Sequence, residues 1–308
     1  MTLRLAGAGP GGVALDARVY GRRDGLALSG SGWSTSAPQV QWVGGGEVEG
    51  RRRLGTRQTL SALVSVGGER VTGVETNAAG EGEPTWLRAS VMAQDEVWLW
   101  DERLLLAPSL RLERAGPYTL ASPKLGATLE LPAGLELRAN VGRAHRAPSF
   151  LELYVRQGTL LPNAGLRPER ALYADAALVH RSDVSFASVG GYVSRYEDLI
   201  SYEAYPPGAA RPYNFADARV GGLEAEGEWR PHPLVSGALS YTLTVSADLQ
   251  RDGRFYLREL PYRPRHKFFA RALVGPRWLT GRVELAAQSS HALTRDGVLV
   301  LPGRAFVH

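Results

Sequence analysis

The chain has 308 residues, with 36 glycines, 19 prolines and no cysteine. This length allows one large domain, and the content of glycine and proline favours a turn-rich β protein over a helical bundle. The lack of cysteine excludes a disulfide framework, a thiolate metal site and a cysteine nucleophile.

The net charge is +5 and nearly all of the positive charge is arginine. Apart from residues 51–53, the arginines are dispersed along strand-like segments, as on a solvated face, so no nucleic-acid partner is predicted. No apolar run reaches the ~18 residues of a membrane helix. Residues 1–5 also lack the apolar region of a signal peptide.

The first glycines form a G-x-G-x-x-G pattern at Gly7, Gly9 and Gly12, after a short apolar segment. In a strand–turn–helix context this pattern binds the pyrophosphate of a dinucleotide. The residues that follow indicate a β-hairpin at Asp24-Gly25, and no βαβ rhythm appears downstream. A Gly-rich turn is therefore favoured, and a soluble dinucleotide-binding oxidoreductase stays open as a remote alternative.

The first half contains alternating segments separated by polar stretches. Residues 30–50 are interpreted as a loop that carries Trp33 and Trp42. Strands are predicted at 57–66, 86–95 and 97–114, because apolar and polar residues alternate there with a period of two.

The second half shows a regular rhythm of strands and connections. Strands are predicted at 125–131, 135–141, 170–180, 184–196, 220–229, 235–245, 267–274 and 279–287. Short turns near 132–134, 181–183, 230–233 and 275–277 alternate with long polar loops near 143–168, 197–216, 246–262 and 288–298. Strands joined in this way place all their long loops at one end. That is typical of a transmembrane β-barrel with periplasmic turns and extracellular loops.

The two faces of these strands agree with a barrel. The apolar files at 125–131, 135–141, 235–245 and 279–287 carry no charge, as lipid contact requires. Trp229 and Trp278 lie beside short turns, where an interfacial aromatic girdle is expected. On the opposite face, Glu224, Glu226 and Glu228 are expected to line the lumen and to pair with arginines such as Arg195 or Arg282. An ordinary soluble sheet remains the alternative to the barrel.

Five segments, in order, resemble motifs of TonB-dependent outer-membrane receptors. The segment Arg146-Ala147-Pro148-Ser149-Phe150-Leu151-Glu152-Leu153-Tyr154 resembles R-x-P-S-F-x-E-L-Y, and residues 162–169 resemble the loop end N-P-x-L-x-P-E. Residues 191–202 include the Tyr-x-Asp-Leu-Ile-x-Tyr pattern. Asn214, Ala218 and Gly222-Leu223-Glu224 match N-x-x-x-A-x-x-x-G-x-E, and residues 260–266 match L-P-Y-R-P-x-H.

The resemblance implies an all-β, antiparallel outer-membrane barrel, 22-stranded in the family and holding an N-terminal plug. Such receptors take up scarce ligands, such as ferric siderophores or cobalamin, with energy delivered by TonB. This chain contains about 13 or 14 predicted strands. We expect residues 1–308 to be a partial barrel, truncated at both ends and without the plug, in contact with outer-membrane lipid. TonB would be a partner only if the missing plug were supplied.

The ligand-binding candidates are aromatic and arginine residues of the long loops, because aromatic rings give apolar contact and arginine suits anionic chelates. They are Arg146, Tyr154, Arg156, Tyr202, Tyr205, Tyr213 and Asn214. No catalytic motif is present and the six histidines are scattered singly, so neither an enzyme, a metal site nor a cofactor is predicted. A passive porin-like or structural outer-membrane protein is the alternative function.

Overall fold

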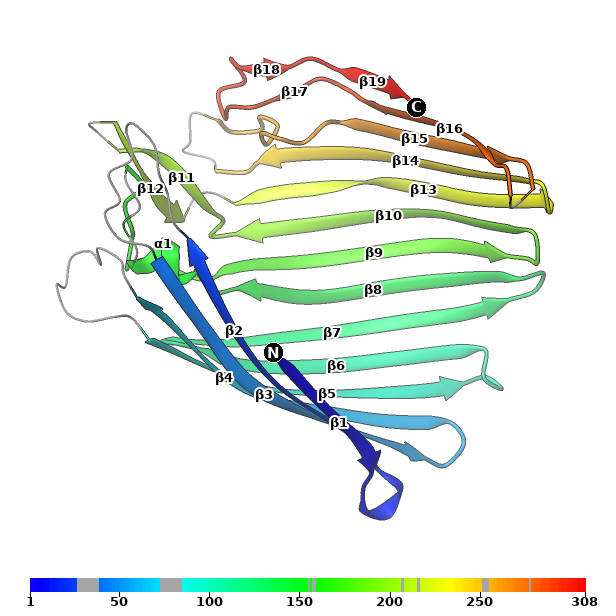
Figure 1. Cartoon of the computed structure of the whole chain (residues 1–308), viewed down its shortest axis with the longest axis horizontal. Helices are drawn as coiled ribbons and strands as arrows, with labels where there is room; N and C mark the ends of the chain where they lie inside the picture. The colour runs from blue at the N-terminus through cyan, green and yellow to red at the C-terminus, as the bar shows by residue number, and fades with distance from the viewer. Residues whose placement is uncertain are drawn as a thin grey trace.

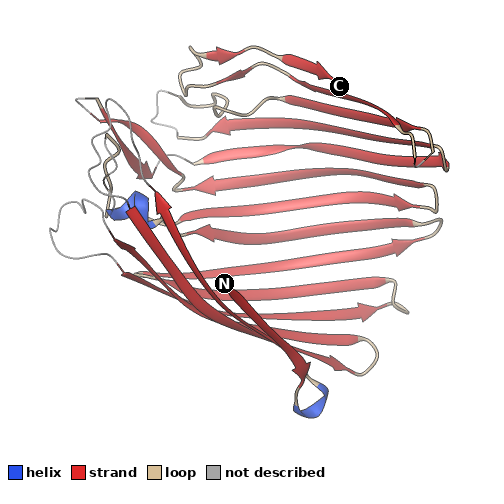
Figure 2. Ribbon diagram, viewed as in Figure 1, coloured by secondary structure: helices blue, strands red, loops and turns tan. Residues whose placement is uncertain are grey.

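The computed structural model describes residues 1–26, 39–72, 85–154, 156, 159–205, 208–214, 217–250, 255–276 and 278–308. Figure 1 shows one broad antiparallel sheet in which neighbouring strands follow each other along the chain. The sheet has fifteen strands, and β1 and β19 are its two ends. It is therefore a curved wall, and it does not close on itself within the described residues (Figure 2).

The strands of the sheet are β1 (Thr2–Ala8), β2 (Ala14–Leu26), β3 (Gln39–Leu54), β4 (Gln58–Thr72), β5 (Thr85–Leu99), β6 (Leu104–Ala115), β7 (Tyr118–Leu131), β8 (Leu135–Arg146), β9 (Glu169–Arg181), β10 (Ser185–Glu197), β13 (Ala218–His232), β14 (Val235–Asp248), β15 (His266–Val274), β16 (Gly281–Gln288) and β19 (Arg304–Val307). Two small hairpins pair β11 (Ile200–Tyr205) with β12 (Ala209–Asn214), and β17 (His291–Ala292) with β18 (Val300–Leu301). The helices are the 3₁₀ turn η1 (Pro10–Gly12) and α1 (Phe150–Tyr154).

The predicted separation of short and long connections is confirmed in the second half of the chain. Residues 132–134, 182–184 and 233–234 connect strands at one end, which we call the turn end. The described parts of 147–168 and 198–217, which include α1, β11 and β12, lie at the other end, and this is the loop end (Figure 1). None of the helices in the described ranges is long and apolar enough to cross a membrane.

Three predictions in the first half are wrong. Gln39–Leu54 is strand, so the part of the predicted loop 30–50 that falls in the described residues is sheet; residues 30–38, with Trp33, lie outside them. The hairpin at Asp24-Gly25 does not form, because β2 continues through both residues and pairs them with Gln41 and Val40. The predicted strand 97–114 is interrupted at residues 100–103.

Two of these errors have a clear physical cause. A Cβ at Gly45 would lie 2.7 Å from the Val66 carbonyl oxygen and 2.9 Å from the Tyr20 hydroxyl. The glycine run in β3 therefore permits a close approach inside the sheet and does not mark a loop. The turn after β5 uses positive φ at Trp100, Asp101 and Glu102, and of these only Asp is a residue type that commonly signals such a turn. Because β3 and β1 are included, the sheet has one or two strands more than the 13 or 14 counted.

The glycine pattern at the N-terminus belongs to a hairpin. Gly7 lies in β1 and pairs with Leu15, and Gly12 ends η1 with φ of 74° before β2 begins. A dinucleotide fingerprint requires a helix that starts at these glycines, and η1 has only three residues. The reading of these glycines as a dinucleotide-binding fingerprint, on which the remote alternative rested, is therefore wrong.

The sheet has an apolar face and a polar face. Leu137 pairs with Leu129 and Leu178, and Leu178 pairs with Val189, so alternate positions form continuous apolar rows across the strands. Leu137, Leu178 and Val189 are 41%, 45% and 61% exposed. A soluble sheet would cover such an extensive apolar surface, whereas a barrel presents it to lipid.

The glutamate row lies on the polar face, as expected, but its predicted partners are wrong. Glu224 pairs across the strands with Gly190, and Arg195 lies five positions further along β10, so their side chains point to opposite faces. Arg195 forms an ion pair with Asp217 at 3.2 Å, and Arg282 forms one with Glu284 at 2.5 Å. The exposed tryptophans Trp229 and Trp278 lie next to connections of the turn end, as expected.

A buried cluster lies at the loop end, on the polar side of the sheet. It consists of Val71, Trp86, Phe150, Leu153 and Leu166, each less than 5% exposed. The Trp86 ring meets Phe150 edge to face, with 4.9 Å between the ring centroids. The described part of loop 147–168 therefore folds over the sheet, and its apolar side chains pack there against Val71 and Trp86.

A substitution at Gly116 would test this packing. It has φ of 55°, and a Cβ there would fall 1.0 Å from the Trp86 Nε1 atom. We expect Gly116→Ala to lower the free energy of unfolding by about 3 kcal/mol or more, since it adds backbone strain and expels the indole. Gly12→Ala is the matched control, because Gly12 also has positive φ but nothing lies within 4 Å of its Cβ. Denaturation followed by circular dichroism measures both; equal losses would show that Trp86 is not confined by Gly116.

Candidate functional site at the loop end

The helix α1 begins with a reciprocal capping box. The Ser149 N–H donates to the Glu152 carboxylate at 2.7 Å, and the Glu152 N–H donates to the Ser149 hydroxyl at 3.3 Å. This start orients Phe150 and Leu153 into the buried cluster. The Ser-Phe-x-Glu-Leu segment thus fixes a short helix in place and turns its apolar side towards the sheet.

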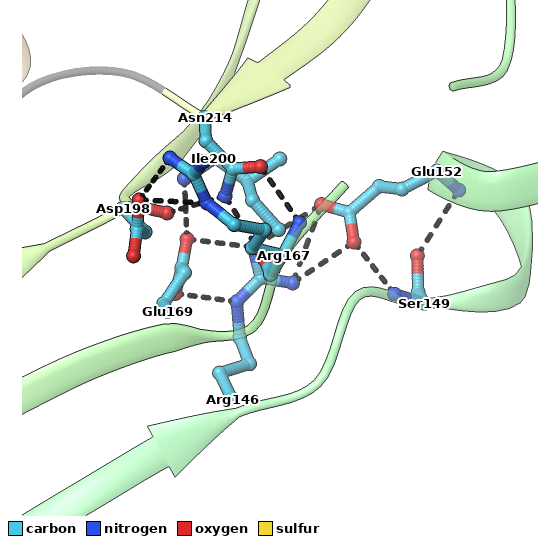
Figure 3. Close-up of polar contacts among 8 residues, drawn as sticks. All are labelled: Arg146, Ser149, Glu152, Arg167, Glu169, Asp198, Ile200 and Asn214. Carbon is cyan, nitrogen blue, oxygen red and sulfur yellow. Dashed lines mark hydrogen bonds and ion pairs between the residues drawn. The ribbon is translucent and has the colours of Figure 1, made fainter. Parts of the chain in front are cut away.

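Arg146, at the end of β8, joins three elements. Its Nε and Nη2 atoms donate to the Glu169 carboxylate at 2.6 and 2.7 Å, and Nη1 donates to the Glu152 carboxylate at 3.0 Å (Figure 3). The two carboxylates are largely buried, with side-chain exposures of 12% for Glu152 and 14% for Glu169. Bidentate pairing of this kind is among the stronger polar contacts in proteins. Arg146 therefore holds β8, α1 and β9 together.

Asn214 performs the same task between loop 147–168 and the segment before β11. Its Oδ1 atom accepts from the Arg167 N–H at 2.7 Å, and its Nδ2 atom donates to the carbonyl oxygens of Arg167 and Asp198 at 2.8 and 2.7 Å. The Asp198 carboxylate also accepts from Arg167 at 2.5 Å and from Arg170 at 2.6 Å. Glu169 completes the connection by accepting the Ile200 N–H at 2.8 Å (Figure 3).

We call this network the loop clamp. Its members are Arg146, Glu152, Arg167, Glu169, Asp198 and Asn214. It fixes the ends of two long loops to the sheet, and one backbone and one side-chain hydrogen bond extend the hold into the β11–β12 hairpin. The Leu161 N–H donates to the Ala210 carbonyl at 2.8 Å, and the Asn163 amide donates to the Pro212 carbonyl at 2.8 Å.

Arg295 connects this hairpin to two further loops. Its guanidinium donates to the buried Asp248 carboxylate at 2.6 Å and to Glu203 of β11 at 3.1 Å. It also lies over the Phe255 ring, 4.9 Å from the centroid. A single side chain therefore contacts the hairpin, the end of β14 and the β14–β15 loop.

Two carboxylates of the clamp, those of Glu152 and Asp198, are held in the ionised form. Burial is the largest single influence on Glu152 and opposes ionisation, but Arg146 and the Ser149 groups together hold its pKa below the ordinary 4.5. Burial acts in the same way on Asp198, and Arg167 with Arg170 holds the pKa of Asp198 below the ordinary 3.8. At Tyr202, burial first and the Glu152 charge second raise the pKa of the phenol.

These shifts predict an acid release of the loops. A lowered folded pKa contributes stability that is fully present above the unfolded value and is lost as the pH falls through the folded value. The clamp should therefore hold at pH 5 to 7 and open only below about pH 4. Hydrogen exchange of the Ile200 and Arg167 amides measures this opening, and the Leu223 amide in the sheet is the control. Loss of protection near neutral pH, or in parallel with Leu223, would contradict the assignment.

The structure brings most of the predicted ligand-binding residues into this region. Arg146 and Asn214 belong to the clamp, and the charge of Glu152 and Arg146 acts on Tyr202, which is 43% exposed. Tyr154 contacts Phe150 in α1, with 5.9 Å between the ring centroids, and Tyr213 lies under the Arg211 guanidinium. Arg156 is exposed beyond α1, and Tyr205 ends β11, with its side chain outside the described residues.

Several residues of the site were not selected from the sequence. Glu152, Arg167, Glu169 and Asp198 all stand inside the quoted motifs, so the motifs themselves carried the signal. Their roles were not predicted, because their ion-pair partners are separated from them in the sequence and meet them only in the folded chain. Arg295 lies outside every motif and had no local signal. Within the described ranges, no group of three or more His, Asp or Glu residues is placed to hold a metal ion.

An antiparallel wall with an apolar outer face, polar inner face and loops gathered at one end defines the class of outer-membrane β-barrel proteins. The chain belongs to the TonB-dependent receptor-like β-barrel family, whose model matches residues 6–297. Barrels of this family are outer-membrane proteins, and they are receptors and transporters.

Solved structures share the fold. The copper transporter OprC is 17% identical, with a TM-score of 0.80, over 99% of this chain and 55% of its own. The FrpB iron transporter from Neisseria meningitidis (F3-3 variant) is 13% identical, with a TM-score of 0.75, over 99% and 54%. A mutant of the ferric enterobactin receptor PfeA from Pseudomonas aeruginosa, in complex with enterobactin, is 17% identical, with a TM-score of 0.76, over 99% and 53%.

The chain therefore spans about half the length of these three proteins. At such low identities the likeness shows a common fold and does not identify a ligand. No curated protein matches the chain.

Proposed function

We propose that this chain forms the wall and loop end of an outer-membrane receptor that binds a scarce small ligand, such as a ferric siderophore or cobalamin, for uptake energised by TonB. The family match over residues 6–297 carries this proposal. The loop clamp supports it, because a receptor needs ordered loops to present a ligand surface and the clamp fixes two of them to the sheet.

Residues 1–308 are the barrel portion in this proposal. Energised transport in the family uses a plug inside the barrel, so coupling to TonB would require a plug together with this wall. Binding of a ligand at the loop end is the step that the residues of this chain can perform directly.

The proposed contact residues fall into two groups. Arg146 and Asn214 act by holding the loops, since their polar atoms are engaged within the protein. Tyr202, exposed on β11 next to the clamp, is the strongest candidate for direct contact, and exposed Arg156, after α1, offers a cation in the other clamped loop. Tyr154 and Tyr213 would extend the aromatic surface, and Tyr205 stays a proposed contact on the grounds of the sequence alone. Aromatic and arginine side chains are the residues that most often dominate binding energy.

Ligand binding tests the proposal. The chain would be placed in outer-membrane vesicles and titrated with ferric enterobactin, ferrichrome, cobalamin and copper by following tryptophan fluorescence. We expect one of them to bind, and Tyr202→Ala to weaken that binding about tenfold or more. Trp100→Ala is the matched control, because this aromatic residue is 67% exposed in a connection at the turn end.

Two results would count against the receptor. Binding that is weakened equally by Trp100→Ala would show that the loop end is not the site. A steady ionic conductance with no ligand bound would favour the passive porin-like alternative.

A further inference from the structure

The ladder between β7 and β8 stops before either strand ends. Its last pair is Lys124 with Gly142, although β7 begins at Tyr118 and β8 continues to Arg146. Pro123 stands at the point where the ladder stops, and it has no N–H to donate. Past this point β7 pairs only with β6, and β8 only with β9. The two strands are then joined by a side-chain contact between Ser122 Oγ and His145 Nδ1 at 3.2 Å.

A cavity of about 550 Å³ lies at this split. Its charged lining consists of Arg88, Arg111, Lys124, Arg143 and Arg146, with Glu113 as the single carboxylate. The size falls within the range of small-molecule sites, which is about 300–1,000 Å³. A strand split therefore forms a recess in the wall whose charged lining residues are mostly cations.

Part of the positive charge of this recess is not balanced by ion pairs. Arg146 is neutralised by Glu152 and Glu169 of the clamp. Glu113 is shared between Arg111 at 3.1 Å and Arg88 at 3.6 Å. Lys124 and Arg143 form no ion pair with any residue in the described part of the chain. Lys124 and Arg143 are thus the two cations of the lining that no carboxylate neutralises within the described residues.

An adjacent cavity on the same face shows the contrast. It has a volume of about 240 Å³ and also includes Arg88, Arg111 and Glu113, but Glu47 and Glu69 line it as well. Its carboxylates outnumber its arginines, so it has no excess of positive charge. The excess is therefore a property of the split and not of the polar face in general.

We propose that the split between β7 and β8 binds a small multivalent oxyanion, of the phosphate or carboxylate class. Like charges that line one cavity repel one another, and an anion with two or more charges reduces that repulsion. Arginine forks match the paired oxygens of phosphates and carboxylates, and lysine supplies a mobile point charge. The site goes beyond the proposed uptake function, because an anion can bind here whether or not the chain transports a ligand.

The test uses the full chain in neutral detergent micelles at low ionic strength. Inorganic pyrophosphate and the metal-free tricarboxylate tricarballylate are titrated separately by calorimetry, so that the two arms distinguish phosphate from carboxylate. The site variant is Lys124→Gln with Arg143→Gln, since neither side chain has an ion pair whose loss would disturb folding. The matched control is Arg138→Gln, on the polar face but paired with Glu136 at 2.8 Å.

We expect at least one probe to bind, the site variant to weaken it about tenfold or more, and the control to change it less than twofold. Added salt should weaken binding to the native chain. Failure of both probes to bind at millimolar concentration overturns the proposal, as does equal weakening by Arg138→Gln. This experiment measures anion binding and involves neither Tyr202 nor uptake. The proposed anion site and the proposed receptor function can therefore be refuted independently.

Discussion

Replacing Leu223 by arginine is expected to reduce the membrane-inserted fraction of the chain about 30-fold or more. Leu223 lies near the middle of β13, is 54% exposed on the apolar face and pairs with Leu243. An arginine facing lipid at mid-depth costs about 2–4 kcal/mol in a membrane barrel. Folding into lipid vesicles, followed by gel mobility before and after heating, measures the inserted fraction.

Thr242→Arg is the control for this prediction. Thr242 pairs across the strands with Glu224 on the polar face, so the new guanidinium would meet a carboxylate and not lipid. We expect its insertion to stay within a fewfold of the native level. If the two variants were impaired equally, the assignment of the two faces would be wrong.

The second large effect is expected at the loop clamp. Arg146→Met would leave the carboxylates of Glu152 and Glu169, 12% and 14% exposed, without their guanidinium. Removing one partner of a largely buried pair costs about 2–4 kcal/mol, because the remaining charge is desolvated and unpaired. Loop 147–168 should then open about 30-fold more often and be cleaved faster by a neutral protease, while the sheet stays folded.

Arg195→Met is the matched control for the clamp. Arg195 also pairs with a carboxylate, Asp217, but the two side chains are 58% and 40% exposed. An exposed pair contributes at most about 1 kcal/mol, so cleavage should change little. Adding Glu152→Gln and Glu169→Gln to Arg146→Met should restore part of the protection, because neutral amides tolerate burial better. Unchanged cleavage in Arg146→Met would show that the clamp does not hold the loop.

The local alternation of apolar and polar residues was sufficient to predict much of the fold. From Leu125 to Leu285, the period of two and the alternation of short and long connections were sufficient to predict strands, faces and ends. This succeeded because a strand in a barrel contacts lipid on one side, and every second side chain must then be apolar. The first half was harder to read, because the glycines of β3 serve a close approach to Tyr20, and residues 100–103 turn without glycine or proline.

The candidate site, like the fold, was predicted only in part from the sequence. The sequence alone determined the family through its motifs, the two-faced strands and the region in which the loops lie. Only the tertiary structure decided what the motif residues do: Arg146, Glu169, Asp198 and Asn214 are 16 to 68 positions apart and become one clamp when the loop ends meet. The recess beside Lys124 and the contacts of Arg295 were likewise decided by folding. Charge balance depends on which side chains lie close together in space, and spacing along the chain does not encode that.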